Sequence, residues 1–132
     1  MKTVLVVEDE KPLNEAITMK LKKKGFNVLN VFLAEEAINI LEKQKIKVDF
    51  IWLDLLLPQI SGLEFLKHIK NNPGFKNQKI AVVSVSGSYD TIEAAKKFGI
   101  TDYIVKSEYK LDDIIDKVAN EINNKINAKQ KQ

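Results

Sequence analysis

The sequence of 132 residues contains no cysteine and no arginine, and all 21 of its positively charged residues are lysine. Without cysteine, a disulfide framework and a thiolate metal or redox site are excluded. Arginine is the side chain that most often reads guanine edges and clamps phosphate groups. Because arginine is missing and the lysines are spread along the chain, the net charge of +3 does not predict nucleic-acid binding.

Long hydrophobic runs are missing as well. The longest, residues 50–58, contains Asp54 and is too short to cross a bilayer. The chain passes from Met1 and Lys2 directly into strand-forming residues, so we expect no signal peptide and predict a cytoplasmic protein without membrane attachment. An apolar content of 45% with a low net charge argues against a disordered chain, and the length suits one domain.

What the chain does contain is an alternation of short apolar runs with helical periodicity. The apolar runs predict five buried strands, at residues 3–7, 26–32, 48–53, 80–83 and 102–105. After each strand, apolar residues recur at helical spacing and predict five helices, beginning near Pro12, Ala34, Ser61, Ser88 or Asp90, and Leu111. The second helix is expected to cover residues 34–43.

Several residues are expected to mark the ends of these helices. Pro12 suits a first helical turn, and Gly25 and Gly99 suit the position after a last turn. Residues 61–64, which begin with Ser61 and end with Glu64, match a capping box. The helix that begins at Leu111 carries its last apolar residue at Ile122, so we expect a domain of residues 1–122, with residues 123–132 as a frayed polar tail or the end of this last helix.

Five strands alternating with five helices predict an α/β fold, a doubly wound sandwich with a five-stranded parallel sheet covered on both faces. In such sheets, ligands bind outside the carboxyl ends of the strands. Four of the five predicted strands end in polar side chains, which are Glu8 and Asp9, Asp54, Ser84 and Lys106. Three carboxylates, a hydroxyl and an ammonium group should therefore meet at one edge.

This combination of groups suits phosphoryl transfer with a divalent cation. Three neighbouring carboxylates repel one another, and Mg²⁺, which prefers oxygen ligands, relieves that repulsion. A carboxylate can also act as a nucleophile and form an acyl phosphate, while Lys106 and Mg²⁺ neutralise the phosphoryl charge and Ser84 donates a hydrogen bond. Acids also favour strand ends for structural reasons, so Asp9 could be only a helix cap and Lys106 only a surface charge. The joint pattern favours a site.

Four segments, at residues 4–10, 52–62, 81–87 and 99–106, carry a resemblance to a known family. Over about residues 2–122 the chain resembles the receiver domain of two-component response regulators and is similar to single-domain chemotaxis regulators. The resemblance implies a flavodoxin-like (βα)5 sandwich with strand order 2-1-3-4-5. It further implies a switch phosphorylated by a histidine kinase or phosphotransfer protein. Because the apolar Leu56 offers an attacking water no hydrogen bond and Val85 adds bulk close by, we expect slow self-dephosphorylation and a reset by a phosphatase or by back-transfer.

The same resemblance implies a role for each residue at the strand ends. Asp54 would be the phosphoacceptor. Asp9 would ligate Mg²⁺ directly, Glu8 mainly through a water molecule, and the Leu56 carbonyl would be a further ligand. Of the remaining residues, Ser84 would be the switch hydroxyl, Lys106 the phosphate-binding lysine and Tyr103 the aromatic side chain that turns inward on activation.

The sequence leaves one assignment open and departs from the family pattern at two positions. Ser86 could replace Ser84 if the preceding loop held an insertion, but Ser84 continues the apolar run directly. Ser107 stands where the family usually has a proline, often after a cis bond, and Val85 stands where it usually has alanine or glycine. A cis bond before serine would cost about 3 kcal/mol, so the Lys106 peptide is expected to be trans, or cis under strain.

The remaining expectations concern other residues and the function as a whole. His68, the only histidine, is expected on the surface without a metal or catalytic role, and Trp52 is expected in the core. The protein should catalyse only its own phosphorylation and dephosphorylation and bind an effector through its fourth helix, fifth strand and fifth helix. A pseudo-receiver scaffold that is never phosphorylated is the alternative. A flavodoxin-like cofactor binder is disfavoured, because residues 8–10 are acidic and would repel phosphate.

Overall fold

The computed structural model describes residues 1–123 and contains a five-stranded parallel sheet in the order β2-β1-β3-β4-β5. The strands are β1 Thr3–Val7, β2 Asn27–Val31, β3 Phe50–Leu53, β4 Ile80–Ser84 and β5 Asp102–Val105. The predicted fold class and strand order are confirmed. The first and fifth strands have the predicted bounds, whereas β2 and β3 are shorter than predicted and β4 includes Ser84.

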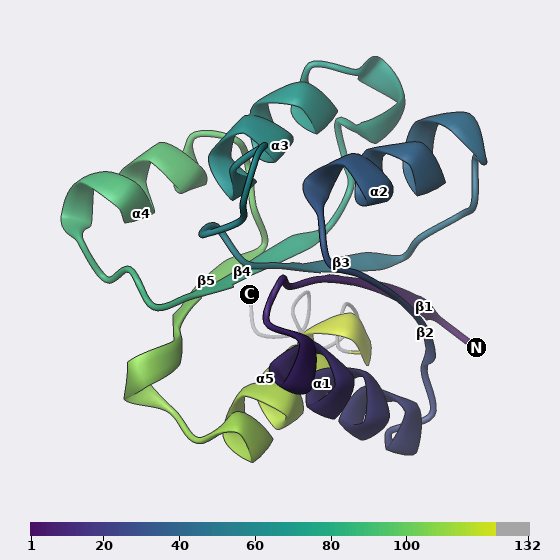
Figure 1. The fold of residues 1–132 in the computed structure, drawn as a ribbon, viewed down its shortest axis with the longest axis vertical. Helices are drawn as coiled ribbons and strands as arrows, with labels where there is room; N and C mark the ends of the chain where they lie inside the picture. Colours follow the sequence, from purple (N-terminus) through teal and green to yellow (C-terminus); the bar gives the residue numbers. More distant parts are fainter. Residues whose placement is uncertain (124–132) are drawn as a thin grey trace, which may run out of the picture.

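Helices cover both faces of the sheet, with α1 and α5 on one side and α2, α3 and α4 on the other (Figure 1). They are α1 Lys11–Lys23, α2 Ala34–Ile38, α3 Gly62–Lys70, α4 Tyr89–Lys96 and α5 Leu111–Asn123. Two 3₁₀ turns, Pro73–Phe75 and Lys106–Glu108, precede β4 and α5. None of the described helices is long and apolar enough to cross a membrane. The predicted tail lies outside the described residues, apart from its first residue, which ends α5.

The core has one layer on each side of the sheet, and the central strand β3 supplies both. Phe50 and Trp52 pack toward α1 and α5, whereas Ile51 and Leu53 pack toward α2, α3 and α4. All four side chains are fully buried, which explains why β3 is apolar throughout rather than alternating. The expectation that Trp52 is a core residue is confirmed.

The helix ends follow the local chemistry of the sequence. Ser61 Oγ accepts a hydrogen bond from the Glu64 N–H (3.1 Å), and a Glu64 carboxylate oxygen accepts one from the Ser61 N–H (3.0 Å), as a capping box requires. Gly25 and Gly99 have φ values of +96° and +70°, which favour glycine, and Ser88 caps α4.

The second helix differs from its prediction. Residues 34–43 do not form one α-helix, because α2 ends at Ile38 and a π-helical turn, Asn39–Lys43, follows. The Gln44 N–H accordingly donates to the Asn39 carbonyl, five residues earlier (2.9 Å). Apolar spacing did not predict this change, because Ala37 and Leu41 are buried in either geometry.

Gly62 allows α3 to begin directly against the end of β3. A Cβ atom at this position would lie 2.5 Å from Leu55 Cα and 2.6 Å from the Asp54 carbonyl oxygen, closer than packed atoms approach. The Gly62 N–H also donates to the Leu55 carbonyl (2.9 Å). This close approach fixes the backbone that carries Asp54.

Two carboxyl groups come together far from the carboxyl ends of the strands, where Glu121 of α5 approaches Asp102 at the start of β5. Burial, and then the neighbouring Asp102 carboxyl, raise the pKa of Glu121 to about 8. The Lys117 ammonium lies 3.5 Å from Asp102 Oδ2 and 3.8 Å from Glu121 Oε2, and it offsets this effect only in part.

Replacing Glu121 with glutamine should stabilise the fold increasingly as the pH rises. Because the Glu121 pKa is raised from 4.5 to about 8 in the native state, ionising this group costs stability between those pH values. We expect Glu121→Gln to match the unmodified protein near pH 5 and to exceed its free energy of unfolding by roughly 1 kcal/mol at pH 9. Urea denaturation at several pH values measures the free energy of unfolding, and the exposed Glu108→Gln is the control. If the unmodified protein and Glu121→Gln show the same pH dependence, the prediction is wrong.

Candidate functional site

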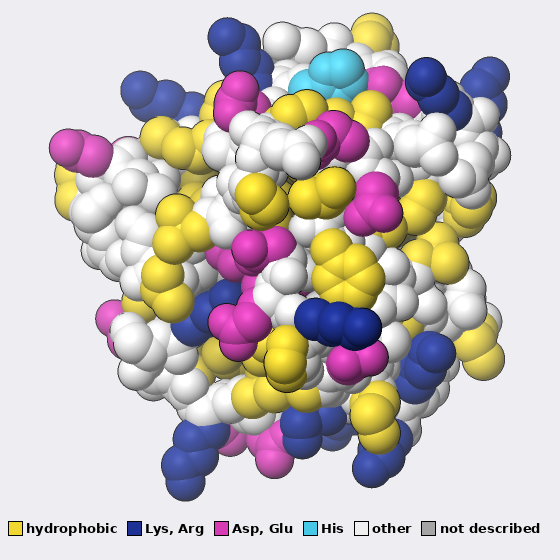
Figure 2. Space-filling view, viewed as in Figure 1, with side chains coloured by type: hydrophobic (Ala, Val, Ile, Leu, Met, Phe, Trp, Pro, Cys, Tyr) yellow, Lys and Arg dark blue, Asp and Glu magenta, His cyan; other side chains and the backbone are white. Residues whose placement is uncertain are grey.

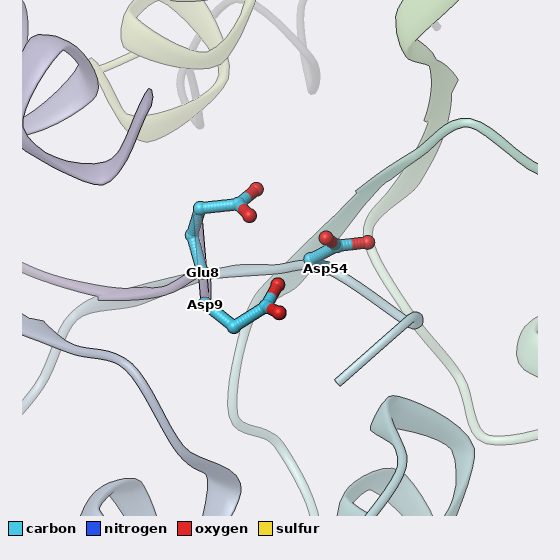
Figure 3. Close-up of side chains that lie close together, drawn as sticks. All are labelled: Glu8, Asp9 and Asp54. Carbon is cyan, nitrogen blue, oxygen red and sulfur yellow. The ribbon is translucent and has the colours of Figure 1, made fainter. Parts of the chain in front are cut away.

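Three carboxylates meet where β1 and β3 end. Val7 pairs with Leu53 in the sheet, so the residues that follow, Glu8 and Asp54, lie at the same level. Single oxygens of Glu8, Asp9 and Asp54 all lie within 4.8 Å of one another, and the first two side chains turn toward the third (Figure 3). The sequence prediction that these acids converge is confirmed.

The three acids differ in their surroundings. Glu8 and Asp54 are only 1% and 5% exposed, whereas Asp9 is exposed. The Leu56 N–H donates to Asp54 Oδ1 (3.1 Å), and the Glu10 N–H donates to Glu8 Oε2 (3.1 Å). Among the described residues, none donates a hydrogen bond to the Asp9 carboxylate. Acidic side chains also gather near the centre of the face in Figure 2, with hydrophobic side chains around them.

Lys106 joins the two buried acids. It begins the 3₁₀ turn that follows β5, and its Nζ donates to Glu8 Oε1 (2.8 Å) and to Asp54 Oδ2 (3.3 Å). Burial raises the pKa of Glu8, and the negative charge of Asp54 raises it further. The hydrogen bond from Lys106 lowers this pKa but does not cancel the other two effects. Burial alone would lower the pKa of Lys106, but its contacts with Glu8 and Asp54 outweigh burial and raise it. The peptide bond to Ser107 is trans, since the described chain has no cis bond.

The donor set fits a hard divalent cation. It consists of carboxylate oxygens only, it carries more negative than positive charge, and one of its members, Asp9, is exposed. Mg²⁺ binds through one or two carboxylates and keeps several waters, which such an open acidic site allows. The roles expected for the Leu56 carbonyl and for a water at Glu8 remain predictions.

Ser84 supplies a hydroxyl at the end of β4. It is the last residue of the strand and is fully buried, and its Oγ has no hydrogen-bond partner among the described residues. A buried polar atom without a partner is uncommon and calls for an explanation, such as a group that it binds in another state. Ser86 lies in the following loop, so Ser84 is the serine that the strand places at the sheet edge.

Tyr103 is partly buried and contacts this loop. Its hydroxyl donates to the Ser86 carbonyl (2.7 Å), and burial raises its pKa. The hydroxyl thus links β5 to the segment between β4 and α4. Whether the side chain turns on activation remains a prediction. His68 lies half-exposed on α3, where its Nε2 is 2.9 Å from a Glu42 carboxylate oxygen, so its expected surface position is confirmed.

Two buried polar residues near the site were not predicted from the sequence. Asn14 and Thr18 of α1 are buried, and the Asn14 amide bonds to the carbonyls of Glu8 and Val31 at 2.8 and 2.9 Å. A signal was available, because Asn14 lies three residues before Ile17 and therefore on the apolar face of the helix. A polar residue on such a face must find buried partners.

Replacing Asp54 with asparagine should stabilise the protein in the absence of divalent cations. The substitution keeps the side-chain shape and the Lys106–Glu8 ion pair but removes one of three crowded negative charges. We expect the free energy of unfolding to rise by roughly 1 kcal/mol. Denaturation in a chelating buffer measures this, with the exposed Asp113→Asn as control. A loss of stability would show that the Asp54–Lys106 attraction outweighs the repulsion.

Comparison with known proteins gives the chain a family. The family model of the response regulator receiver domain matches residues 4–119. The chain is 32% identical over 104 residues to the uncharacterized transcriptional regulatory protein YcbL of Bacillus subtilis, covering 77% of this chain and 43% of that protein. It is 31% identical over 103 residues to the phosphate regulon transcriptional regulatory protein PhoB of Escherichia coli, covering 78% of this chain and 44% of that protein. The chain therefore spans less than half of the length of these relatives.

Solved structures agree over nearly the whole length of the chain. The Mn²⁺-bound form of response regulator Rcp1 superimposes with a TM-score of 0.79 and 26% identity, covering 95% of this chain and 94% of that one. A response regulator receiver domain protein from Clostridium thermocellum superimposes with a TM-score of 0.81 and 25% sequence identity, covering 98% of each chain. With its strand order, its acidic edge and its lysine after β5, the chain belongs to the receiver domains of two-component response regulators.

Proposed function

We propose that this receiver domain is a phosphorylation switch in which Asp54 accepts a phosphoryl group from a histidine kinase or phosphotransfer protein. The observation that supports this best is that, among the described residues, one cation, Lys106, contacts both buried acids, while the buried Ser84 hydroxyl at the end of the neighbouring strand β4 has no hydrogen-bond partner there. A phosphoryl group on Asp54 would meet positive charge and a hydrogen-bond donor there. His68 is the only histidine of the sequence and lies on the surface of α3, so we propose that the phosphodonor histidine belongs to another protein.

The transfer itself asks little of the protein beyond position and charge. A carboxylate oxygen of Asp54 attacks phosphorus, and an acyl phosphate P–O bond forms as the P–N bond of the phosphohistidine breaks. The imidazole leaves with the electron pair. Asp54 Oδ1 is oriented by the Leu56 N–H, and Oδ2 lies 3.3 Å from Lys106 Nζ. Lys106 can therefore move its hydrogen bond from Asp54 to a phosphoryl oxygen while it keeps its contact with Glu8.

The carboxylates of Glu8, Asp9 and Asp54, with the Leu56 carbonyl, would hold Mg²⁺. When bound, this cation supplies positive charge that the transferring phosphoryl group needs. Lys106 alone cannot balance three carboxylates and a phosphoryl group, which is the reason to expect that phosphorylation depends on the metal.

The output is proposed to be binding of an effector protein through α4, β5 and α5. Once a phosphoryl oxygen draws on the Ser84 hydroxyl, the residues that follow Ser84 must adjust. Ser86 in this loop accepts the Tyr103 hydrogen bond, so the change would reach β5 through that contact. The protein would catalyse only its own phosphorylation and dephosphorylation. A cytoplasmic location remains a prediction from the sequence.

The pseudo-receiver alternative rests on Val85 and Ser107 and is not favoured. Val85 is 55% exposed, so its side chain lies at the surface and is not buried among the acids. The peptide bond between Lys106 and Ser107 is trans, and Lys106 nevertheless reaches both buried acids. Neither departure removes a group that phosphorylation would need.

Phosphorylation can be tested with a small phosphodonor. After treatment with acetyl phosphate and Mg²⁺, mass spectrometry should find one added phosphoryl group that is stable in acid and labile in alkali. Asp54→Ala should abolish it, whereas the exposed Asp113→Ala should not. A phosphoryl group that persists in Asp54→Ala would move the site elsewhere, and an unmodified protein that never gains one would support the pseudo-receiver alternative.

Loss of the phosphoryl group should be slow. Hydrolysis needs a water molecule in line with the P–O bond. Leu56, two residues after Asp54, offers that water no hydrogen bond, and Val85, directly after Ser84, adds apolar bulk on the path by which water would approach. We expect Leu56→Asn and Val85→Ala each to speed dephosphorylation, about tenfold for Leu56→Asn. The matched control is Met19→Asn on α1, because Met19 is an apolar residue that is 60% exposed, much like Leu56 at 57%.

The decay of the phosphorylated protein after removal of the phosphodonor measures this rate. If the unmodified protein loses phosphate within seconds, or if neither substitution accelerates the loss, apolar shielding does not set the rate.

A further inference from the structure

The Asn14 side chain joins three elements at the corner where the acidic site begins. Its Nδ2 donates to the carbonyl of Glu8 (2.8 Å), at the end of β1, and to the carbonyl of Val31 (2.9 Å), at the end of β2. Its Oδ1 accepts from Asn30 Nδ2 (2.7 Å) and, at 3.4 Å, from the Thr18 hydroxyl. Both donors and both acceptor positions of the amide are thus used.

The carbonyl that Asn14 binds belongs to the peptide unit between Glu8 and Asp9. The orientation of this unit decides the direction in which the Asp9 side chain leaves the strand. Glu8 is held a second time, because its N–H donates to the Val31 carbonyl (3.2 Å), the same oxygen that accepts from Asn14. Asn14 therefore fixes both sides of the turn that carries two of the three acids.

The chemistry of the amide suits this task. Asparagine is neutral, so it adds no charge to a site that already holds three carboxylates. Its two N–H groups bind carbonyl oxygens and leave the carboxylate oxygens of Glu8 and Asp9 available to other partners. A buried apolar side chain of the same size would leave the Glu8 carbonyl without its Asn14 partner, and the Glu8–Asp9 peptide unit would lose the side-chain bond that fixes its orientation.

We propose that Asn14 is a positioning residue for the metal-binding acids: it holds the Glu8–Asp9 peptide unit so that the Asp9 carboxylate faces Asp54. The inference rests on the proposed function only in that the acids bind Mg²⁺. In metalloproteins, groups that orient a ligand typically contribute a factor of ten or more to metal affinity. The same factor is expected here, although Asn14 touches neither the metal nor the carboxylates.

The test measures Mg²⁺ affinity by calorimetry in the full chain and needs no phosphorylation. We expect Asn14→Leu to weaken Mg²⁺ binding about tenfold. Thr18→Val is the matched control, because Thr18 is buried on the same helix and contacts Asn14 but not Glu8; its affinity should stay within about twofold. The Asp9 amide resonance of the metal-free protein should shift in Asn14→Leu and remain in place in Thr18→Val.

A second variant covers the case in which Asn14→Leu does not fold. Asn30 is exposed, and Asn30→Ala removes only the 2.7 Å hydrogen bond that orients the Asn14 amide. This variant should fold and lose about threefold in Mg²⁺ affinity.

The outcomes separate this inference from the proposed function. If the unmodified protein binds Mg²⁺, Asp9→Asn loses the binding, and both the Asn14→Leu and Asn30→Ala variants bind like the unmodified protein, the positioning role is wrong and the metal site stands. An equal loss of affinity in Thr18→Val would also overturn the role, because the effect would then follow packing of α1. If the unmodified protein binds no Mg²⁺, both proposals fail.

Discussion

Crowding of negative charge at one edge of the sheet is the constraint around which this structure is organised. Glu8 and Asp54 are almost completely buried, with Asp9 beside them, and the only contacting cation among the described residues is Lys106. Such a cluster is unfavourable without further positive charge. The crowding therefore favours a bound cation, and we expect it to cost the metal-free protein some stability.

The rest of the fold holds the crowded groups in place. Parallel pairing of β1 with β3 sets Glu8 level with Asp54, and the missing side chain of Gly62 lets α3 pack against the backbone of Asp54. Lys106 reaches the acids from the far end of the chain, through β5. On the β1 side, Asn14 ties α1 to the ends of β1 and β2. These contacts are made by backbone atoms, by the buried Asn14 side chain and by the partly buried Lys106, and together they place the acids side by side before any ligand binds.

Much of this arrangement could be predicted from the sequence, because it depends on local rules. Apolar runs marked the strands, and the parallel sheet then brought their polar ends to one edge, so the meeting of Glu8, Asp9, Asp54 and Lys106 followed from topology alone. Capping chemistry marked Ser61, and the conformational freedom of glycine marked Gly25 and Gly99. The roles of these residues came from the resemblance to receiver domains rather than from spacing.

The parts that could not be predicted depend on contacts between distant segments. The π-helical turn after Ile38 keeps the same residues buried as an α-helix would, so apolar spacing does not reveal it. The Tyr103 hydrogen bond to the Ser86 carbonyl joins two strands through a loop whose path the sequence does not fix. The apolar face of α1 marks Asn14 as a polar residue that needs buried partners. Two of those partners, the carbonyls of Glu8 and Val31, could not be identified from the sequence, because backbone carbonyls leave no trace in residue types.

The central claim is that the groups at the strand ends form one phosphoryl site around Asp54. The most direct measurement is an NMR titration with beryllofluoride, which mimics a phosphoryl group, in the presence of Mg²⁺. The account predicts that the resonances of Glu8, Asp9, Ser84 and Lys106 shift together, saturate together and do not respond in Asp54→Ala. Shifts confined to one strand end, or an unchanged response in Asp54→Ala, would contradict it.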